Sequence, residues 1–302
     1  MTAMIDQAYP THAADRLLAA CRTKGAPVCV GLDPVITRFP DVLGGLDPVV
    51  AIERFCLEVI DAVAEHVPAI KPQIACFERY GSAGYAVYER VVTAGREAGL
   101  FVVGDAKRGD IGTSSAHYAS GLLAGEEEGV AGCDALTVNT YLGTDGLEPF
   151  VKAAAATGRG LFALVRTSNP GGNLLQGASL ADGRTVAESV ADMVADMGCT
   201  HLGESGYSLL GAVVGATQPE DAVSLRQRMP QQIFLVPGFG AQGGSAEDVR
   251  ACFKADGTGA LITASRSVIY AYNPADEDWP AAVTQAAIDL RSQIRDLFSS
   301  SA

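Results

Sequence analysis

Short apolar runs alternate with amphipathic stretches along most of the chain. The apolar runs are rich in β-branched residues and are bounded by turn residues, which predicts buried strands. They cover residues 28–32, 69–74, 100–105, 135–138, 161–165, 212–215, 233–236 and 260–263. Apolar residues recur at helical spacing over residues 48–63, 78–98, 114–127, 146–156, 185–197, 219–228, 246–253 and 279–298. This alternation predicts an α/β fold and favours a (β/α)8 TIM barrel over a doubly wound sheet.

Four details complete the predicted architecture. Residues 11–24 carry apolar side chains at helical spacing, which predicts a short N-terminal helix ahead of the barrel. Pro72 lies inside a strand candidate and would ordinarily mark an edge strand. The pattern is weakest over residues 181–211, where we expect residues 199–207 to form a loop insertion. No Pro/Gly/Ser-rich linker divides the chain, so residues 1–302 are predicted to form a single barrel domain.

Composition narrows the possible partners and the cellular compartment. The net charge of −13 argues against nucleic-acid and anionic membrane surfaces, although it permits a local basic pocket for one phosphate. The chain carries no signal-like apolar N-terminus and no apolar run long enough to span a membrane. Its seven cysteines show no metal-ligand spacing. We therefore expect a reduced, metal-free cytoplasmic protein.

The segment 104–111 carries the most concentrated charge chemistry. Because side chains alternate along a strand, Asp105 and Lys107 are predicted to share one face, with Ala106 on the other. Gly109 is expected to turn the chain sharply, so that Asp110 joins this charged strand end. A surface salt bridge is the alternative interpretation, but the fully apolar strand predicts partial enclosure. A lysine held between carboxylates stays protonated and can deliver a proton to a carbanion.

Further polar residues follow other predicted strands. Asp33, Lys71, Ser168, Gln242 and Arg266 lie at or just after strand ends, where barrel enzymes build their active sites. A charged lysine is costly to bury alone, so Lys71 is predicted to join the cluster of Asp105 rather than to reach solvent at the rim. For Asp33, capping of the turn at the Asp-Pro sequence is an equal alternative.

The glycine-rich segment 238–243 formally satisfies the dinucleotide-binding pattern G-x-G-x-x-G. It follows the seventh predicted strand, which leaves too little chain for a Rossmann half. Loops after strands seven and eight of a barrel frequently bind phosphate, and Arg266 can bind a phosphate bidentately. We therefore predict a site for a single phosphate.

The sequence Asp105-Ala106-Lys107-Arg108-Gly109-Asp110-Ile111 resembles the D-x-K-x-x-D-I signature of the orotidine 5′-phosphate decarboxylase family, in the form of its longer bacterial members. Five further family-like segments follow in the expected order over nearly the whole chain. They are residues 31–34, 70–73, 167–171, 236–244 and 265–267.

The resemblance implies a reaction and four charged catalytic residues. The substrate would be orotidine 5′-monophosphate, and the products uridine 5′-monophosphate and carbon dioxide, with no metal and no organic cofactor. By similarity, Asp105 would lie against the substrate carboxylate and Lys107 would protonate C6. Lys71 and Asp110 would complete the charge network. In this family the second aspartate comes from the neighbouring subunit, which implies a homodimer.

The resemblance also implies the binding residues. Asp33 matches the ribose contact, Ser168 the residue that reads the pyrimidine, and Gln242 and Arg266 the phosphate contacts. Ser114 stands where a threonine is usual among the partner-subunit contacts, and its hydroxyl is retained. Ser265 stands where glycine is common before the phosphate arginine, which can alter the backbone approach.

Two rival hypotheses share these features. A related barrel decarboxylase or aldolase acting on a sugar phosphate would keep Asp105 and Lys107 but would not need the loop 167–170. A catalytically silent sensor of a phosphorylated ligand would typically lack one of the four charged residues, and all four are present.

Overall fold

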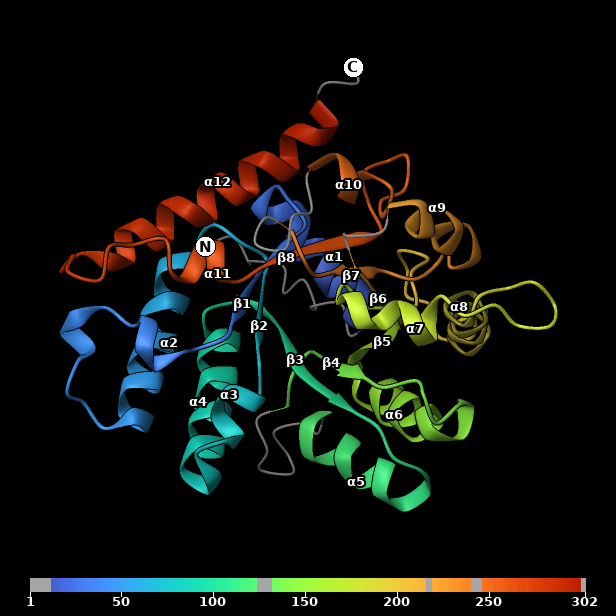
Figure 1. Cartoon of the computed structure of the whole chain (residues 1–302), viewed down its shortest axis with the longest axis horizontal. Coiled ribbons are helices and arrows are strands. Elements are labelled where there is room, and N and C mark those ends of the chain that lie inside the picture. The colour runs from blue at the N-terminus through green and yellow to red at the C-terminus, as the bar shows by residue number, and fades with distance from the viewer. Residues whose placement is uncertain (1–11, 124–131, 216–218, 240–245, 300–302) are drawn as a thin grey trace, which may run out of the picture.

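The fold is a closed barrel of eight parallel strands (Figure 1), which confirms the TIM-barrel prediction. The computed structural model describes residues 12–123, 132–215, 219–239 and 246–299. The strands are β1 (Val28–Leu32), β2 (Ala69–Pro72), β3 (Phe101–Arg108), β4 (Ala135–Val138), β5 (Gly160–Arg166), β6 (Leu210–Val214), β7 (Phe234–Val236) and β8 (Ala260–Ala264). Each strand pairs with its neighbours in sequence, and pairing of β1 with β8 closes the barrel.

Helices surround the barrel (Figure 1). They are α1 (Ala13–Lys24), α2 (Pro48–Val63), α3 (Ala75–Glu78), α4 (Gly81–Glu97), α5 (Gly112–Leu123), α6 (Thr144–Thr157), α7 (Asn173–Gln176), α8 (Val186–Gly198), α9 (Pro219–Arg228), α10 (Ala246–Arg250), α11 (Arg266–Ile269) and α12 (Trp279–Ser299). The helix predicted over 78–98 corresponds to α4, which begins at Gly81 with a left-handed φ of 63°. The short helix α3 ahead of it was not predicted. The predicted helix end at 124–127 lies outside the described residues. No described helix is long and apolar enough to cross a membrane.

Strand alternation separates two apolar cores. On β1, Val28, Val30 and Leu32 pack outward against the helices, while Cys29 belongs to the barrel interior. On β3, Phe101 and Val103 also face the interior. Side chains on one face of a strand recur every second residue, so the interior series on β3 continues to Asp105 and Lys107. The apolar strand thereby carries its charged end to one mouth of the barrel.

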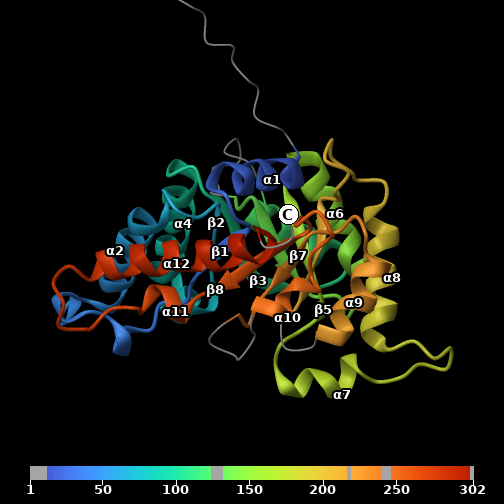
Figure 2. The ribbon, with the colours of Figure 1, turned by 90° about the horizontal axis from the view of Figure 1, so that it is seen from above.

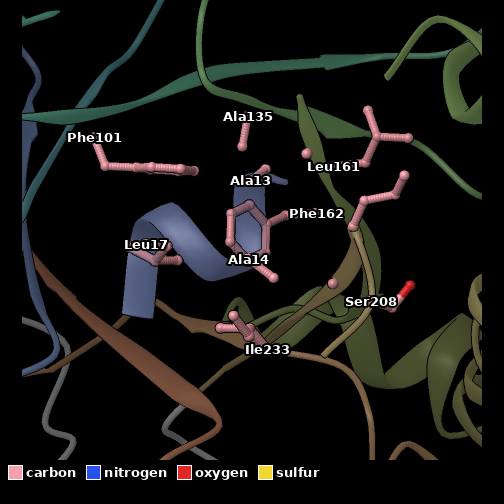
Figure 3. A pocket seen from close by; sticks show the side chains of 12 residues that line it. Ala13, Ala14, Leu17, Phe101, Ala135, Leu161, Phe162, Ser208 and Ile233 are labelled. Carbon is pink, nitrogen blue, oxygen red and sulfur yellow. The ribbon is translucent and has the colours of Figure 1, made fainter. Parts of the chain in front are cut away.

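Helix α1 is the predicted N-terminal helix, and it closes the opposite mouth of the barrel (Figure 2). Ala13, Ala14 and Leu17 are buried against interior residues that include Phe101 and Phe162 (Figure 3). The space left between the helix and the barrel is only about 10 Å³, too little for any ligand larger than a water molecule. This end of the barrel is therefore packed core.

The predicted loop insertion at 199–207 fastens α1 in place. The Asp15 carboxylate of α1 accepts hydrogen bonds from the backbone N–H groups of Glu204 and Ser205, both at 2.9 Å. These hydrogen bonds lower the pKa of Asp15 despite the opposing effect of its burial. The His12 side chain lies 3.2 Å from the carbonyl oxygen of His201. The loop thus belongs to the closed end of the barrel, away from the charged cluster.

Two predicted strand ends need correction. Strand β2 was expected to run to residue 74 but ends at Pro72, so Pro72 does not make it an edge strand, and the next N–H, of Gln73, donates to the Leu32 carbonyl at 3.0 Å. Strand β3 was expected to end at Asp105 but continues to Arg108. Its pairing with β4 shifts register between Gly104 and Arg108, so the strand is irregular where its charged residues lie.

Candidate active site

Three charged side chains meet at the open mouth of the barrel. The Asp105 carboxylate lies between two lysines, with Lys71 Nζ 2.7 Å from Oδ2 and Lys107 Nζ 2.5 Å from Oδ1. Lys71 comes from β2, whereas Asp105 and Lys107 come from β3, as the alternation predicts. Ala106, between them, packs outward in the helix-facing core. The sequence-based expectation that Lys71 joins this cluster is therefore met.

Two neutral side chains complete the environment of Asp105. Gln73 Nε2 donates to Oδ2 at 3.0 Å, and the Thr137 hydroxyl donates to Oδ1 at 3.0 Å. Each carboxylate oxygen therefore accepts from one lysine and one neutral donor. The sequence analysis gave neither Gln73 nor Thr137 a role. Gln73 ends one of the family-like segments, but a lone threonine in the apolar strand β4 carries no signal.

The burial of this cluster fixes its protonation state. Asp105 is 5% and Lys71 6% exposed, so burial alone would favour their neutral forms. The positive charges of Lys71 and Lys107 outweigh that effect and hold the pKa of Asp105 well below its usual range. Burial alone would lower the pKa of Lys71, but the carboxylates of Asp105 and Asp33 raise it above its usual value. Both groups are thus charged at neutral pH.

Lys107 differs from Lys71 in its exposure. Its side chain is 45% exposed, compared with 8% for Lys71, so its ammonium group reaches open space while touching Asp105. A ligand beside Asp105 would meet this ammonium group directly. The two lysines therefore differ in access: Lys71 is enclosed, whereas Lys107 faces open space.

The open space next to the cluster is a cavity of about 470 Å³, within the usual range for a small-molecule site. The charged cluster, Asp33, Ser168 and Arg266 all line it, so the structure brings together most of the predicted site. The described lining residues are Asp33, Lys71, Gln73, Asp105, Lys107, Thr137, Leu164, Thr167, Ser168, Asn169, Val213, Leu235, Pro237, Gly238, Phe239, Thr263, Ser265 and Arg266.

Asp33 presents its carboxylate to the cavity just after β1. Its side chain makes no hydrogen bond within the described part of the chain, so the structure does not support the turn-capping alternative. Tyr270 holds its backbone instead, donating to the Asp33 carbonyl at 2.8 Å and accepting from the Val35 N–H at 2.7 Å. Sequence reasoning missed Tyr270, because this contact joins the segment after β8 to the loop after β1, and these lie far apart in the sequence.

Ser168 lies in the loop after β5, beneath a network centred on Arg166. The buried Arg166 guanidinium binds Asp221 at 2.7 Å and also donates to Gln176 at 3.3 Å. Gln176 Oε1 in turn accepts the N–H of Thr167 at 2.9 Å. Gly215 allows the loop to approach, since a Cβ there would lie 2.9 Å from the Cα of Ser168. These contacts fix where the loop enters the cavity.

Arg266 begins α11 directly after β8 and is exposed at the cavity wall. The preceding Ser265 packs over β1, where a Cβ on Gly31 would lie 1.9 Å from the Ser265 hydroxyl oxygen. The serine thus fits because Gly31 has no side chain. Gln242, predicted as the second phosphate contact, lies outside the described residues.

Asp110 and Ser114 do not join the cavity, which corrects the expectation that Asp110 packs beside Lys107 on the same strand end. The Asp110 carboxylate accepts the N–H of Ile111 at 2.8 Å and makes no ion pair among the described residues. Gly109 does not turn the chain through a left-handed φ, and its lack of a side chain instead permits close contact with Asn139. Ser114 is exposed on α5.

The fold and the cavity define the class of protein: a (β/α)8-barrel enzyme that binds a small ligand at the C-terminal ends of its strands. Residues 26–277 match the model of the orotidine 5′-phosphate decarboxylase / HUMPS family. The chain belongs to this family, as its D-x-K-x-x-D-I segment predicts.

Individual relatives agree with the family match. A protein from Rhodopirellula baltica named orotidine 5′-phosphate decarboxylase is 45% identical over 298 residues, covering 93% of this chain and 98% of that protein. A protein of the same name from Deinococcus radiodurans is 42% identical over 268 residues, 88% of this chain and 91% of the relative. A crystal structure described as a putative orotidine 5′-phosphate decarboxylase from Streptomyces avermitilis has a TM-score of 0.83 and 37% identity, covering 99% of this chain and 100% of that one.

Proposed function

We propose that this protein decarboxylates orotidine 5′-monophosphate to uridine 5′-monophosphate in pyrimidine biosynthesis. The observation that carries the proposal is the Lys71–Asp105–Lys107 cluster at the wall of a ligand-sized cavity, in a chain of this family. The names of the relatives support the same substrate, because long, nearly full-length matches carry the decarboxylase name. A sugar-phosphate enzyme or a silent sensor has no comparable support.

In the proposed reaction, Asp105 and Lys107 act on the two sides of the breaking bond. The substrate carboxylate would lie against the charged Asp105, and this repulsion favours its loss. The bond from C6 to the carboxylate breaks, its electron pair stays on C6, and carbon dioxide leaves. The Lys107 ammonium group stabilises the carbanion and then transfers a proton to C6. The neutral lysine regains its proton from solvent, which its partly exposed side chain can reach.

Residues far from C6 would supply binding energy. We assign Asp33 to the ribose, Ser168 to the pyrimidine ring, and Arg266 with Gln242 to the phosphate. Contacts to the non-reacting phosphate and ribose hold the ring against the cluster, so that binding energy is used at the reacting carbon. The cavity volume of about 470 Å³ is large enough for a nucleotide of this size.

We propose a homodimer in which a second copy donates Asp110 and Ser114 to the cavity. In the single chain Asp110 is only partly buried, and the next residue, Ile111, is 57% exposed. An exposed apolar side chain beside a carboxylate that makes no ion pair with the described residues fits a surface that a second copy covers. We further propose that residues 1–302 form one domain, that the enzyme needs no metal or organic cofactor, and that it works in the cytoplasm. All seven cysteines are free, which fits a reducing compartment.

The decisive experiment follows the loss of the orotate chromophore when purified protein meets orotidine 5′-monophosphate in the presence of a metal chelator. We expect turnover by the wild-type protein and none by Lys107→Ala. Lys152→Ala is the matched control, since the Lys152 side chain is 80% exposed on α6 and does not line the cavity. Absence of turnover by folded wild-type protein would contradict the proposal. Tight binding of uridine 5′-monophosphate without turnover would then identify a sensor.

A further inference from the structure

The backbone of Lys107 has an unusual conformation. Its φ is 48°. In the part of the chain that the structure describes, Lys107 is the only non-glycine residue with a positive φ. A lysine in the left-handed region is strained and persists only where its surroundings enforce it. The unusual conformation lies at the lysine that we assign as proton donor. What enforces it therefore bears on catalysis.

Strand pairing does not enforce it, because the β3–β4 ladder is interrupted here. Gly104 pairs with Leu136 and Arg108 with Val138, so three residues of β3 stand opposite the single residue Thr137. Asp105 forms a bridge with Gln73 on the β2 side, so the bulge leaves the N–H groups of Ala106 and Lys107 without regular ladder partners on β4. Buried N–H groups need acceptors, and a side chain can provide one.

The Thr137 hydroxyl provides that acceptor. The N–H groups of Ala106 and Lys107 both donate to its oxygen at 3.0 Å. Its own proton points to Asp105 Oδ1 at 3.0 Å, with the Gly104 carbonyl further away at 3.4 Å. A hydroxyl has two lone pairs and one proton, so all its hydrogen-bonding capacity is used. Thr137 is 1% exposed, so water cannot substitute for it.

We propose that Thr137 is the positioning residue of the proton donor. Its hydroxyl fixes the left-handed turn at Lys107 and the rotamer of Asp105 at the same time. Lys107 Nζ and Asp105 Oδ1 are in short contact, and the positions of both side chains therefore depend on the Thr137 hydroxyl oxygen. Thr137 acts through these two residues and is not itself a proton donor. This inference rests on the proposed function, which assigns Lys107 as the proton donor.

Two substitutions separate the hydroxyl from the methyl group. Thr137→Val keeps the shape and removes the hydroxyl, whereas Thr137→Ser keeps the hydroxyl and removes the methyl. We expect Thr137→Val to lower kcat by about 10- to 100-fold, as small misplacements of reacting groups do. We expect its KM and its affinity for uridine 5′-monophosphate to stay near wild type. Thr137→Ser should recover most of the lost kcat. Thr137→Ala, with the hydroxyl also absent, should repeat the valine result.

A matched control tests whether loss of any buried hydroxyl has this effect. Thr140 follows β4, is buried, and donates to the Leu164 carbonyl at 2.7 Å without lining the cavity. Thr140→Val should therefore leave kcat unchanged. An unchanged kcat in Thr137→Val, or an equal loss in Thr137→Ser, would overturn the proposal. So would a loss of kcat in Thr140→Val as large as that in Thr137→Val.

Amide hydrogen exchange gives a readout that does not depend on turnover. The N–H groups of Ala106 and Lys107 should be protected in the wild type and in Thr137→Ser, and should exchange much faster in Thr137→Val. Equal protection in all three proteins would overturn the inference. If the wild type proves inactive on orotidine 5′-monophosphate, the proposed function fails, and the exchange comparison still decides the role of Thr137.

Discussion

The two mouths of the barrel each hold a buried carboxylate between two cations. At the open mouth, Asp105 lies between Lys71 and Lys107. At the closed mouth, Asp134 Oδ1 accepts from Arg16 at 3.0 Å and from Arg159 at 2.9 Å. Asp134 Oδ2 accepts the N–H of Val102 at 3.0 Å. The two clusters thus have the same charges, and their carboxylates are similarly buried, at opposite ends of the same sheet.

Their cations and their surroundings differ. Arginine keeps its proton at any physiological pH, whereas lysine can lose it to a strong base such as a carbanion. The arginine cluster lies at the end that α1 closes, where only about 10 Å³ remains open. The lysine cluster lines about 470 Å³. A buried ion cluster of this kind therefore indicates a catalytic site only when one of its cations can transfer a proton and open space lies beside that cation.

Neutralising the two carboxylates should have very different effects on turnover. Asp105→Asn should lower kcat/KM on the order of 10³-fold, because the substrate loses an opposing charge and Lys107 loses its fixed partner. Asp134→Asn should leave kcat/KM unchanged and lower the free energy of unfolding by about 1–3 kcal/mol. Steady-state kinetics and urea unfolding of both variants check this. Similar losses of kcat/KM in the two variants would contradict the conclusion that the open mouth is catalytic and the closed mouth structural.

The pH dependence of stability should report the lysine cluster. The pKa of folded Asp105 lies below its unfolded value, so its contribution is present above about pH 4 and is lost as pH falls through the folded pKa. The pKa of folded Lys71 is raised, so its contribution is present below about pH 10 and is lost at higher pH. Wild-type stability should therefore have a broad neutral plateau.

Urea unfolding across the acid range tests this assignment. Asp105→Asn should flatten the acid limb, removing more than about 1 kcal/mol of its pH dependence. An acid limb as steep in the variant as in the wild type would show that other carboxylates cause it.

The smallest predicted effect concerns a single hydroxyl beside Asp33. Tyr270→Phe removes the hydrogen bonds of its hydroxyl to the Asp33 carbonyl and the Val35 N–H, and it should raise KM several-fold, equivalent to about 1 kcal/mol, with little change in kcat. Tyr272→Phe is the matched control, because the Tyr272 hydroxyl donates to the Arg38 carbonyl at 2.8 Å in the same aromatic cluster. Equal KM values for the two variants would remove Tyr270 from the binding of the ribose.

Periodicity in the sequence was enough to predict the barrel. Strand and helix patterns are local, and eight repeats of one pattern leave few architectures. The same alternation predicted that Asp105 and Lys107 share a face. Errors arose where tertiary contacts, rather than local structure, explain the choice of residue. Gly109 is an example, because its small size permits close contact with Asn139 and does not serve a turn.

The site was predictable only in part. Residues that carry charge at strand ends, such as Lys71 and Arg266, could be found because barrel topology brings strand ends together. Thr137 and Tyr270 could not, because their roles depend on which backbone groups lie within hydrogen-bonding distance across the sheet. The expectation that Asp110 lies beside Lys107 of the same chain was wrong, because nearness in sequence does not fix direction once the strand has bulged. Its donation to a second copy stays a prediction.

A pair of charge-conserving substitutions tests the central claim most directly. Lys107→Arg keeps the positive charge but provides a cation that does not release its proton, and Arg159→Lys makes the reverse change at the closed mouth. With orotidine 5′-monophosphate as substrate, we predict that Lys107→Arg loses about 10²- to 10⁴-fold in kcat while Arg159→Lys turns over like the wild type. Near-normal turnover by Lys107→Arg would contradict the assignment of Lys107 as proton donor.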